Sequence, residues 1–198
     1  MSTPAAEQEF AWRQATTGDL ILFSGRNPAH RRVQKWAGSP WSQIAIVLCV
    51  PQLREPCVLS ATSLPICPDI ETGALRTGVS TTSLSLTAQA FDGDLCLCRL
   101  RPALTPDLIG RLLSFRGLVV GRPFDFSELS FRQTIRRSHA SFTPNVFMCA
   151  SLVAFAYQFI SVLSLPPVGP LPNNTWPCDF APEGRIKLAS GYSLYCIH

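Results

Sequence analysis

One cysteine of the sequence stands where a thiol can act as a nucleophile. Cys149 follows Pro144-Asn145 and lies about three residues into an apolar segment that predicts a helix. A free thiol with a pKa of about 8.5 is only a few per cent ionised at neutral pH, whereas a helix N-terminus favours the thiolate. The position indicates either a reactive nucleophile or an inert cysteine on an all-apolar helix.

A cysteine nucleophile also needs a base and a group that orients the base. The chain contains three histidines, His30, His139 and His198. His139 lies ten residues before Cys149, in the loop that leads to its helix, and is the first choice for a base. A solvated loop histidine is the simpler interpretation of each of the three.

Eight cysteines raise the questions of disulfides and metals. The chain is long and the spacing irregular, so they do not form the disulfide framework of a small scaffold. Cys96 and Cys98 are two residues apart, and in a strand they would point to the same face. No Cys-x-x-Cys pair occurs, and no histidine has zinc-ligand spacing from two cysteines, so we expect no metal site and no cofactor.

Buried free thiols in a reducing, cytoplasmic compartment are therefore the favoured interpretation of the cysteines. The first residues, MSTPAAEQEF, are small and polar and give no sign of a secretion signal.

Composition limits the elements that can position these residues. The chain has 198 residues, of which 46% are hydrophobic and 15% charged, so we expect one domain, 1–198, with a sizeable core. The net charge of +4 gives no nucleic-acid signature and is compatible with a weak attraction to an anionic membrane surface. Two basic clusters could supply that attraction, one at Arg26, Arg31, Arg32 and Lys35 and one at Arg132, Arg136 and Arg137.

The hydrophobic pattern predicts an α+β fold with a mostly antiparallel sheet. Residues 43–50, QIAIVLCV, are the clearest strand and are apolar on both faces. A Thr-Pro-Asp start at 105–107 predicts a helix that Gly117 ends. The other expected strands are 20–23, 57–61, a short one around Val79, 95–100 and 192–197, and the other expected helices are 26–38 and 146–160.

Residues 146–165 need a membrane test, because they are long enough to span a bilayer. The segment contains Tyr157, Gln158 and three serines, and no basic residue flanks it closely. A helix that is apolar on all sides is equally a buried core helix, and this is the interpretation we favour over a membrane anchor.

Four segments in this order resemble the permuted NlpC/P60 superfamily, a branch of the papain-like cysteine hydrolases. They are 17–23 (TGDLILF), 39–47 (SPWSQIAIV), 58–61 (VLSA) and 147–153 (FMCASLV), and the ending 176–180 (WPCDF) resembles the family's loop after the nucleophile helix. The resemblance implies a circularly permuted papain-like fold, with an antiparallel barrel-like sheet packed on a buried nucleophile helix.

The same resemblance implies the site residues. Cys149 takes the nucleophile position, Gln43 stands where the family has its histidine, and Ser60 stands where a carboxylate would orient that histidine. Gln43 cannot take up a proton, although it can hydrogen-bond a carbonyl or an oxyanion. Ser60 carries no charge, so an ordinary Cys-His-acid triad cannot be assembled from these positions.

We therefore expect a papain-like cysteine-hydrolase fold that is catalytically impaired or inactive and serves as a binding or virion-associated module. Some members of this branch are encoded by large DNA viruses. The ligand would be a peptide or an acyl lipid in an apolar groove beside Cys149. The alternative is an active cysteine amidase, peptidase, thioesterase or acyltransferase that uses Cys149 with a non-standard base.

Overall fold

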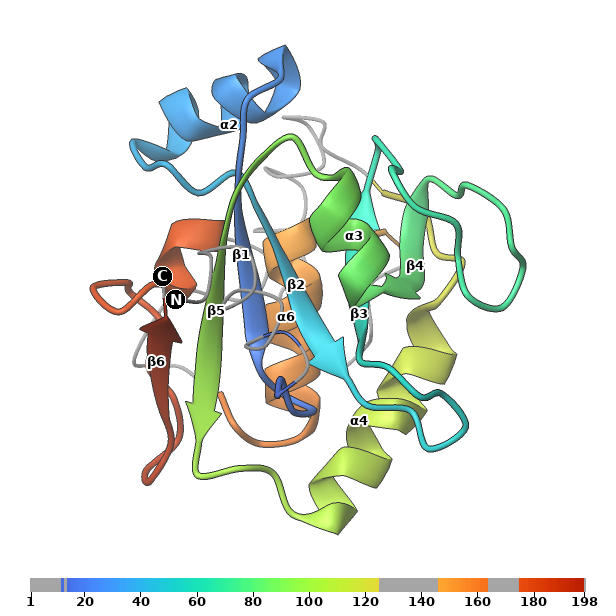
Figure 1. Ribbon diagram of the computed structural model, residues 1–198. Coiled ribbons are helices and arrows are strands. Elements are labelled where there is room, and N and C mark those ends of the chain that lie inside the picture. The colour runs from blue at the N-terminus through green and yellow to red at the C-terminus, as the bar shows by residue number, and fades with distance from the viewer. Residues whose placement is uncertain (1–11, 13, 125–145, 164–174, 198) are drawn as a thin grey trace, which may run out of the picture.

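The computed structural model describes residues 12, 14–124, 146–163 and 175–197, which form a mixed α+β fold around one sheet. All neighbouring strands of the sheet are antiparallel, and their order is β4-β3-β2-β1-β5-β6 (Figure 1). The strands are β1 (Leu20–Gly25), β2 (Gln43–Leu48), β3 (Cys57–Thr62), β4 (Gly78–Ser83), β5 (Gly93–Arg101) and β6 (Ser193–Ile197). The predicted antiparallel sheet is confirmed.

The centre of the sheet is buried on both faces, as the apolar pattern of β2 predicts. Ile44 and Ile46 belong to a core that contains residues of helices α4 (Pro106–Val119) and α6 (Cys149–Phe159). Ala45 and Val47 belong to a second core on the opposite face, which includes Leu84 of helix α3 (Leu84–Ala90). Figure 1 shows α6 behind the sheet and α3 in front of it.

Helix α3 was not predicted, and helix α4 is longer than predicted. α3 was not expected, because it lies in a Ser/Thr-rich stretch; the Ser83 side chain caps it by accepting from the Leu86 N–H at 3.3 Å. α4 runs past Gly117 to Val119, so the prediction that Gly117 ends it is wrong. Val119 is fully buried, and packing of this last turn outweighs the weak helix propensity of glycine.

Helix α6 is the predicted buried helix, but it begins at Cys149 rather than three residues earlier. Met148 is its N-cap, and the Ser151 hydroxyl accepts a hydrogen bond from the Met148 N–H at 3.0 Å. The Tyr157 hydroxyl, fully buried on this helix, donates to the Gly18 carbonyl oxygen at 2.6 Å. Across the parts of the chain that the structure describes, no helix has the length and apolarity needed to cross a membrane.

Hydrogen bonds to a fully buried acid fix the turn that leads into β1. The Asp19 carboxylate accepts from the Thr16 N–H at 2.8 Å and from the Leu100 N–H at 2.9 Å. One acid thereby ties the start of β1 to β5, so Asp19 has the structural role expected from its Gly-Asp turn.

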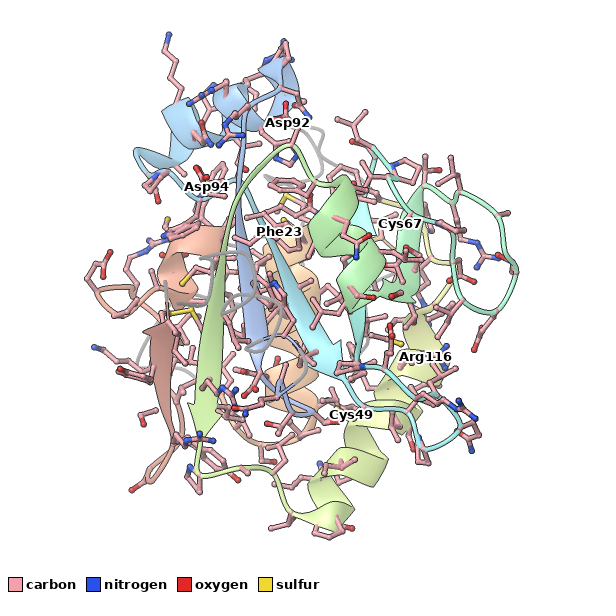
Figure 2. The ribbon with its side chains drawn as sticks, viewed as in Figure 1. Phe23, Cys49, Cys67, Asp92, Asp94 and Arg116 are labelled. Atoms are coloured by element: carbon pink, nitrogen blue, oxygen red, sulfur yellow. A yellow bond between two sulfur atoms is a disulfide. The ribbon has the colours of Figure 1, made fainter. Side chains whose placement is uncertain are left out.

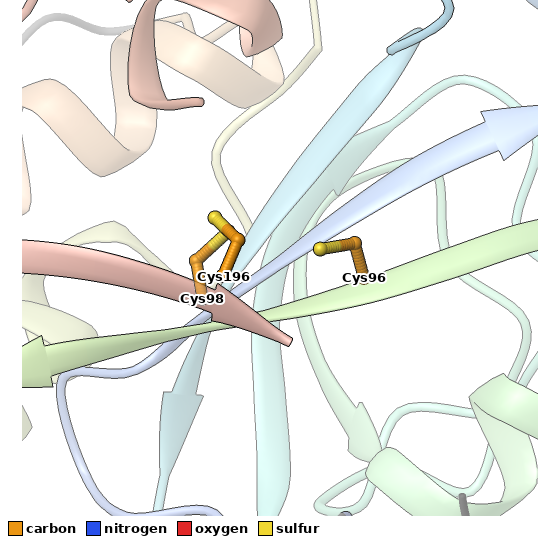
Figure 3. Close-up of side chains that lie close together, drawn as sticks. All are labelled: Cys96, Cys98 and Cys196. Carbon is orange, nitrogen blue, oxygen red and sulfur yellow. A yellow bond between two sulfur atoms is a disulfide. The ribbon is translucent and has the colours of Figure 1, made fainter. Parts of the chain in front are cut away.

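The end of the chain is attached to the sheet by a disulfide between Cys98 of β5 and Cys196 of β6 (Figure 3). These residues face each other in the strand register. The expectation that the cysteines are free thiols is therefore wrong for this pair. Sequence spacing could not reveal it, because 98 residues separate the two cysteines and only the β5–β6 pairing brings them together.

Candidate functional site

Cys149 lines a cavity of about 240 Å³ at the end of the sheet where β2 begins. Helix α2 (Pro28–Ala37) lies beyond this end of the sheet and forms one wall of the cavity (Figure 1). The other walls come from the start of β2, the end of β3, the start of α6 and the segment 175–177. Most of the lining is apolar and includes Val33, Trp36, Leu64, Phe124, Met148 and Trp176.

Cys149 is the first residue of α6 and is half-buried. Burial raises the pKa of Cys149 to about 11, although the backbone N–H groups of Ile44, Ala150 and Cys149 itself lower it in part. A helix N-terminus favours a thiolate, but desolvation is the larger effect here. The thiol is therefore protonated at neutral pH, which is the opposite of what an activated nucleophile requires.

Of the two predicted partners of Cys149, Gln43 lines the same cavity as Cys149 and Ser60 does not. Gln43, the first residue of β2, lines both the Cys149 cavity and a smaller one of about 120 Å³. Ser60 is buried on β3, opposite Ser80 of β4, and lines only the smaller cavity. Gln43 thus lines the cavity that contains Cys149, whereas Ser60 does not.

His30 of α2 lines both cavities, although the sequence favoured His139 as the base. Its Nδ1 lies 2.8 Å from the Ser42 hydroxyl, which also accepts from the Gly25 N–H at 3.1 Å and donates to the Phe23 carbonyl at 3.0 Å. Because the hydroxyl has a single proton, all three bonds form together only if Nδ1 carries the imidazole proton. This arrangement leaves Nε2 as the basic nitrogen.

Burial lowers the pKa of His30, so its imidazole is neutral at neutral pH. The turn between β1 and α2 explains its position: Asn27 caps the helix by accepting from the His30 N–H at 3.0 Å, and the ring packs against Gly25. The favoured base from the sequence, His139, lies outside the described residues, as does the basic cluster of Arg132, Arg136 and Arg137.

Helix α2 presents a basic surface beside the cavity. It contains no buried residue, and its Trp36 side chain is 57% exposed. Arg31, Arg32 and Lys35 lie on this helix, and Arg32 lines the cavity itself. The neighbouring Arg26 forms ion pairs with Asp92 and Asp94, which lie below α2 in Figure 2.

A buried acid, Asp179 of the 3-10 helix Pro177–Phe180, holds the cavity wall formed by Trp176 and Pro177. Asp179 accepts from the Trp176 N–H at 2.7 Å and forms a two-pronged ion pair with Arg185 at 2.6 and 2.8 Å. These bonds fix the segment that contributes Trp176 and Pro177 to the cavity. The sequence marked this segment only by its resemblance, with no role for Asp179.

Comparison with solved structures finds similarity to the crystal structure of the metalloprotein yiiX from Escherichia coli O157:H7, described as DUF1105. The two chains are 19% identical, and the match has a TM-score of 0.56 and covers 79% of this chain and 71% of that chain. No protein-family model matches the sequence, and no curated protein matches it. At this identity, the similarity shows a shared mixed α+β fold.

Proposed function

We propose that this chain is a binding module that holds the acyl chain of an anionic lipid in the cavity beside Cys149. The observation that carries the proposal is the combination, at one end of the sheet, of an apolar cavity with the basic helix α2. An apolar cavity accepts the hydrocarbon, and the cations beside it attract the headgroup.

The dimensions suit partial insertion of a ligand. Pockets that enclose a drug-sized molecule measure roughly 300–1,000 Å³, and this cavity measures about 240 Å³. It would hold part of an acyl chain while the headgroup stays outside, near Arg31, Arg32 and Lys35. Trp36, which lines the cavity and is exposed, is the kind of side chain that lies at a membrane interface.

The chemistry of the site supports binding over cleavage. Cys149 is protonated at neutral pH, and the residue at the start of β2 is Gln43, which cannot take up a proton. We propose that the scaffold is a circularly permuted papain-like fold of the NlpC/P60 type, with a barrel-like sheet, whose proton-transfer partners have been replaced. Cytoplasmic localisation and virion association stay predictions from the sequence.

Vesicle co-sedimentation and fatty-acid titration test this proposal together. We expect the chain to bind phosphatidylserine vesicles in preference to phosphatidylcholine vesicles, and salt to weaken the binding. A basic residue near an anionic surface contributes about 1 kcal/mol, so replacing Arg31, Arg32 and Lys35 by Gln should reduce partitioning by about 100-fold.

A matched pair of variants on α2 tests the cavity. Val33→Phe fills the cavity and should weaken dodecanoate binding at least about 10-fold, as followed by tryptophan fluorescence from Trp36 and Trp176. Ala37→Phe adds the same ring on α2 outside the cavity lining and should leave binding unchanged. Equal loss in both variants, or competition by an apolar peptide with no lipid binding, would contradict a lipid site.

The second candidate function is an active cysteine hydrolase or acyltransferase in which His30 replaces the missing histidine as base. The observation that favours it is that His30 lines the Cys149 cavity, with Nδ1 held by Ser42 and Nε2 basic. In that case His30→Ala would abolish hydrolysis of a model thioester, and Ser42→Ala would change its pH profile. If the wild-type chain shows no thioester hydrolysis that depends on Cys149, this function is excluded.

A further inference from the structure

Three cysteine sulfurs lie together between the last two strands of the sheet, apart from the Cys149 cavity. The Sγ atoms of Cys96, Cys98 and Cys196 all lie within 4.8 Å of one another (Figure 3). None of the three residues lines the cavity beside Cys149.

Strand pairing explains the juxtaposition. Cys96 and Cys98 are two residues apart on β5, so their side chains point to the same face, as the sequence predicted. Cys196 of β6 lies opposite Cys98 in the register, and cross-strand partners share a face. The three sulfurs therefore converge because of strand register and the alternation of side chains along a strand.

The cluster lies in the core at its β5 side. Cys96 and Cys98 are completely buried beside Leu22 and Leu20, their partners on β1. Cys196 is half-buried and gives the cluster a side that an ion can reach. The disulfide occupies two of the sulfurs, while Cys96 remains a free thiol that donates a weak hydrogen bond to the Ile197 carbonyl at 3.5 Å.

We propose that, when the disulfide is reduced, Cys96, Cys98 and Cys196 bind one Zn²⁺ ion, so that β5 and β6 are joined either by a metal or by a disulfide. Thiolates are the ligands that structural zinc sites use most, and such sites take four ligands. The sequence continues from Cys196 with Ile197 and His198, which repeats the two-residue spacing of Cys96 and Cys98. His198 lies outside the described residues, so the proposal is based on the three sulfurs.

The exchange between the two states balances with a dithiol as reductant. Two electrons and two protons from the dithiol convert the Cys98–Cys196 disulfide into two thiols, and the dithiol becomes a disulfide. Zn²⁺ then displaces the protons of the three thiols, which leave to solvent, and three Zn–S bonds form. Oxidation by a disulfide of the same class reverses the sequence and releases the ion.

Cobalt substitution in the full-length chain tests the proposal. After reduction with a phosphine, the chain should bind one Co²⁺ with thiolate-to-cobalt charge-transfer absorption, and Zn²⁺ should displace the cobalt. Loss of a residue that only hydrogen-bonds a metal ligand weakens metal affinity about 10- to 100-fold. Cys96→Ser removes a ligand itself, so it should weaken cobalt affinity at least about 100-fold. The matched control Cys57→Ser, a buried strand cysteine outside the cluster, should bind like the wild type.

A second variant and a redox arm keep the test decisive. If Cys96→Ser fails to fold, Cys196→Ser replaces it in the test. This variant changes the half-buried member of the cluster, and its cobalt affinity should fall to the same extent. The oxidised chain, identified by a mass lower by two hydrogens, should give no charge-transfer absorption. A folded, reduced chain without that absorption, or Cys96→Ser that binds cobalt like the wild type, would overturn the proposal.

Discussion

The ionisation of Cys149 gives the sharpest prediction. At pH 8 a thiol with a pKa of about 11 is ionised in roughly one molecule in 1,000, whereas a free thiol of pKa about 8.5 is ionised in roughly one in four. Because alkylation consumes the thiolate, Cys149 should react with iodoacetamide roughly 200-fold more slowly than a free thiol at that pH. Partial burial of the side chain lowers the rate further.

Peptide mass spectrometry of the alkylated full-length chain measures this rate for each cysteine separately. Cys49, which is exposed, serves as the internal reference for access by the reagent. The rate at Cys149 should keep rising up to pH 10 with no plateau. A plateau near pH 6, or modification of Cys149 ahead of Cys49 at pH 7, would refute the conclusion that burial keeps this thiol protonated.

The variant Gln43→His extends the same assay. Gln43 lines the cavity that holds Cys149, so an imidazole introduced there can form an ion pair with the thiolate. We expect the pKa of Cys149 to fall and its alkylation at pH 8 to accelerate about 10-fold or more. Gln43→Asn, which adds no titratable group, is the control, and equal rates in both variants would contradict an ion pair.

Two further predictions concern stability. Tyr157→Phe leaves the buried Gly18 carbonyl without its 2.6 Å hydrogen bond and should lower the free energy of unfolding, measured in urea, by about 1–3 kcal/mol. The control Tyr195→Phe changes a side chain that is 66% exposed and should alter this free energy by less than about 0.5 kcal/mol. Burial lowers the pKa of His30, so the folded state disfavours the charged ring. The contribution of the neutral His30 ring to the free energy of unfolding is therefore complete above about pH 6.5 and falls as the pH drops below that value. Thermal unfolding between pH 7.5 and 5 should show this loss, and His30→Gln should reduce it; an identical loss in that variant would contradict the assignment to His30.

Local patterns predicted much of the fold. The apolar run at 43–50 predicted a strand buried on both faces, which the structure shows over Gln43–Leu48, two residues shorter. Thr105-Pro106-Asp107 predicted the start of α4, because capping acts between near neighbours. Helix α3 escaped prediction, because its only local signal is the cap at Ser83 and packing of Leu84 stabilises it. Tertiary contacts, not propensity, decide such short helices.

The site was less predictable than the fold. The position of Cys149 at the start of a buried helix followed from the sequence, but its raised pKa depends on side chains packed from other elements. His30 reaches the cavity only because α2 folds back over the start of β2, and the cysteine cluster forms only when β6 pairs with β5. Local spacing indicated only that Cys96 and Cys98 share a face of β5.

One measurement tests most directly whether the site binds rather than cleaves. The full-length chain is incubated at pH 7.5 with an acyl thioester, and its intact mass and the released thiol are followed while tryptophan fluorescence reports binding. The expected result is saturable binding with no acyl adduct and no thiol release above the rate of Cys149→Ala. An acyl group on Cys149, or thiol release that Cys149→Ala abolishes, would contradict it.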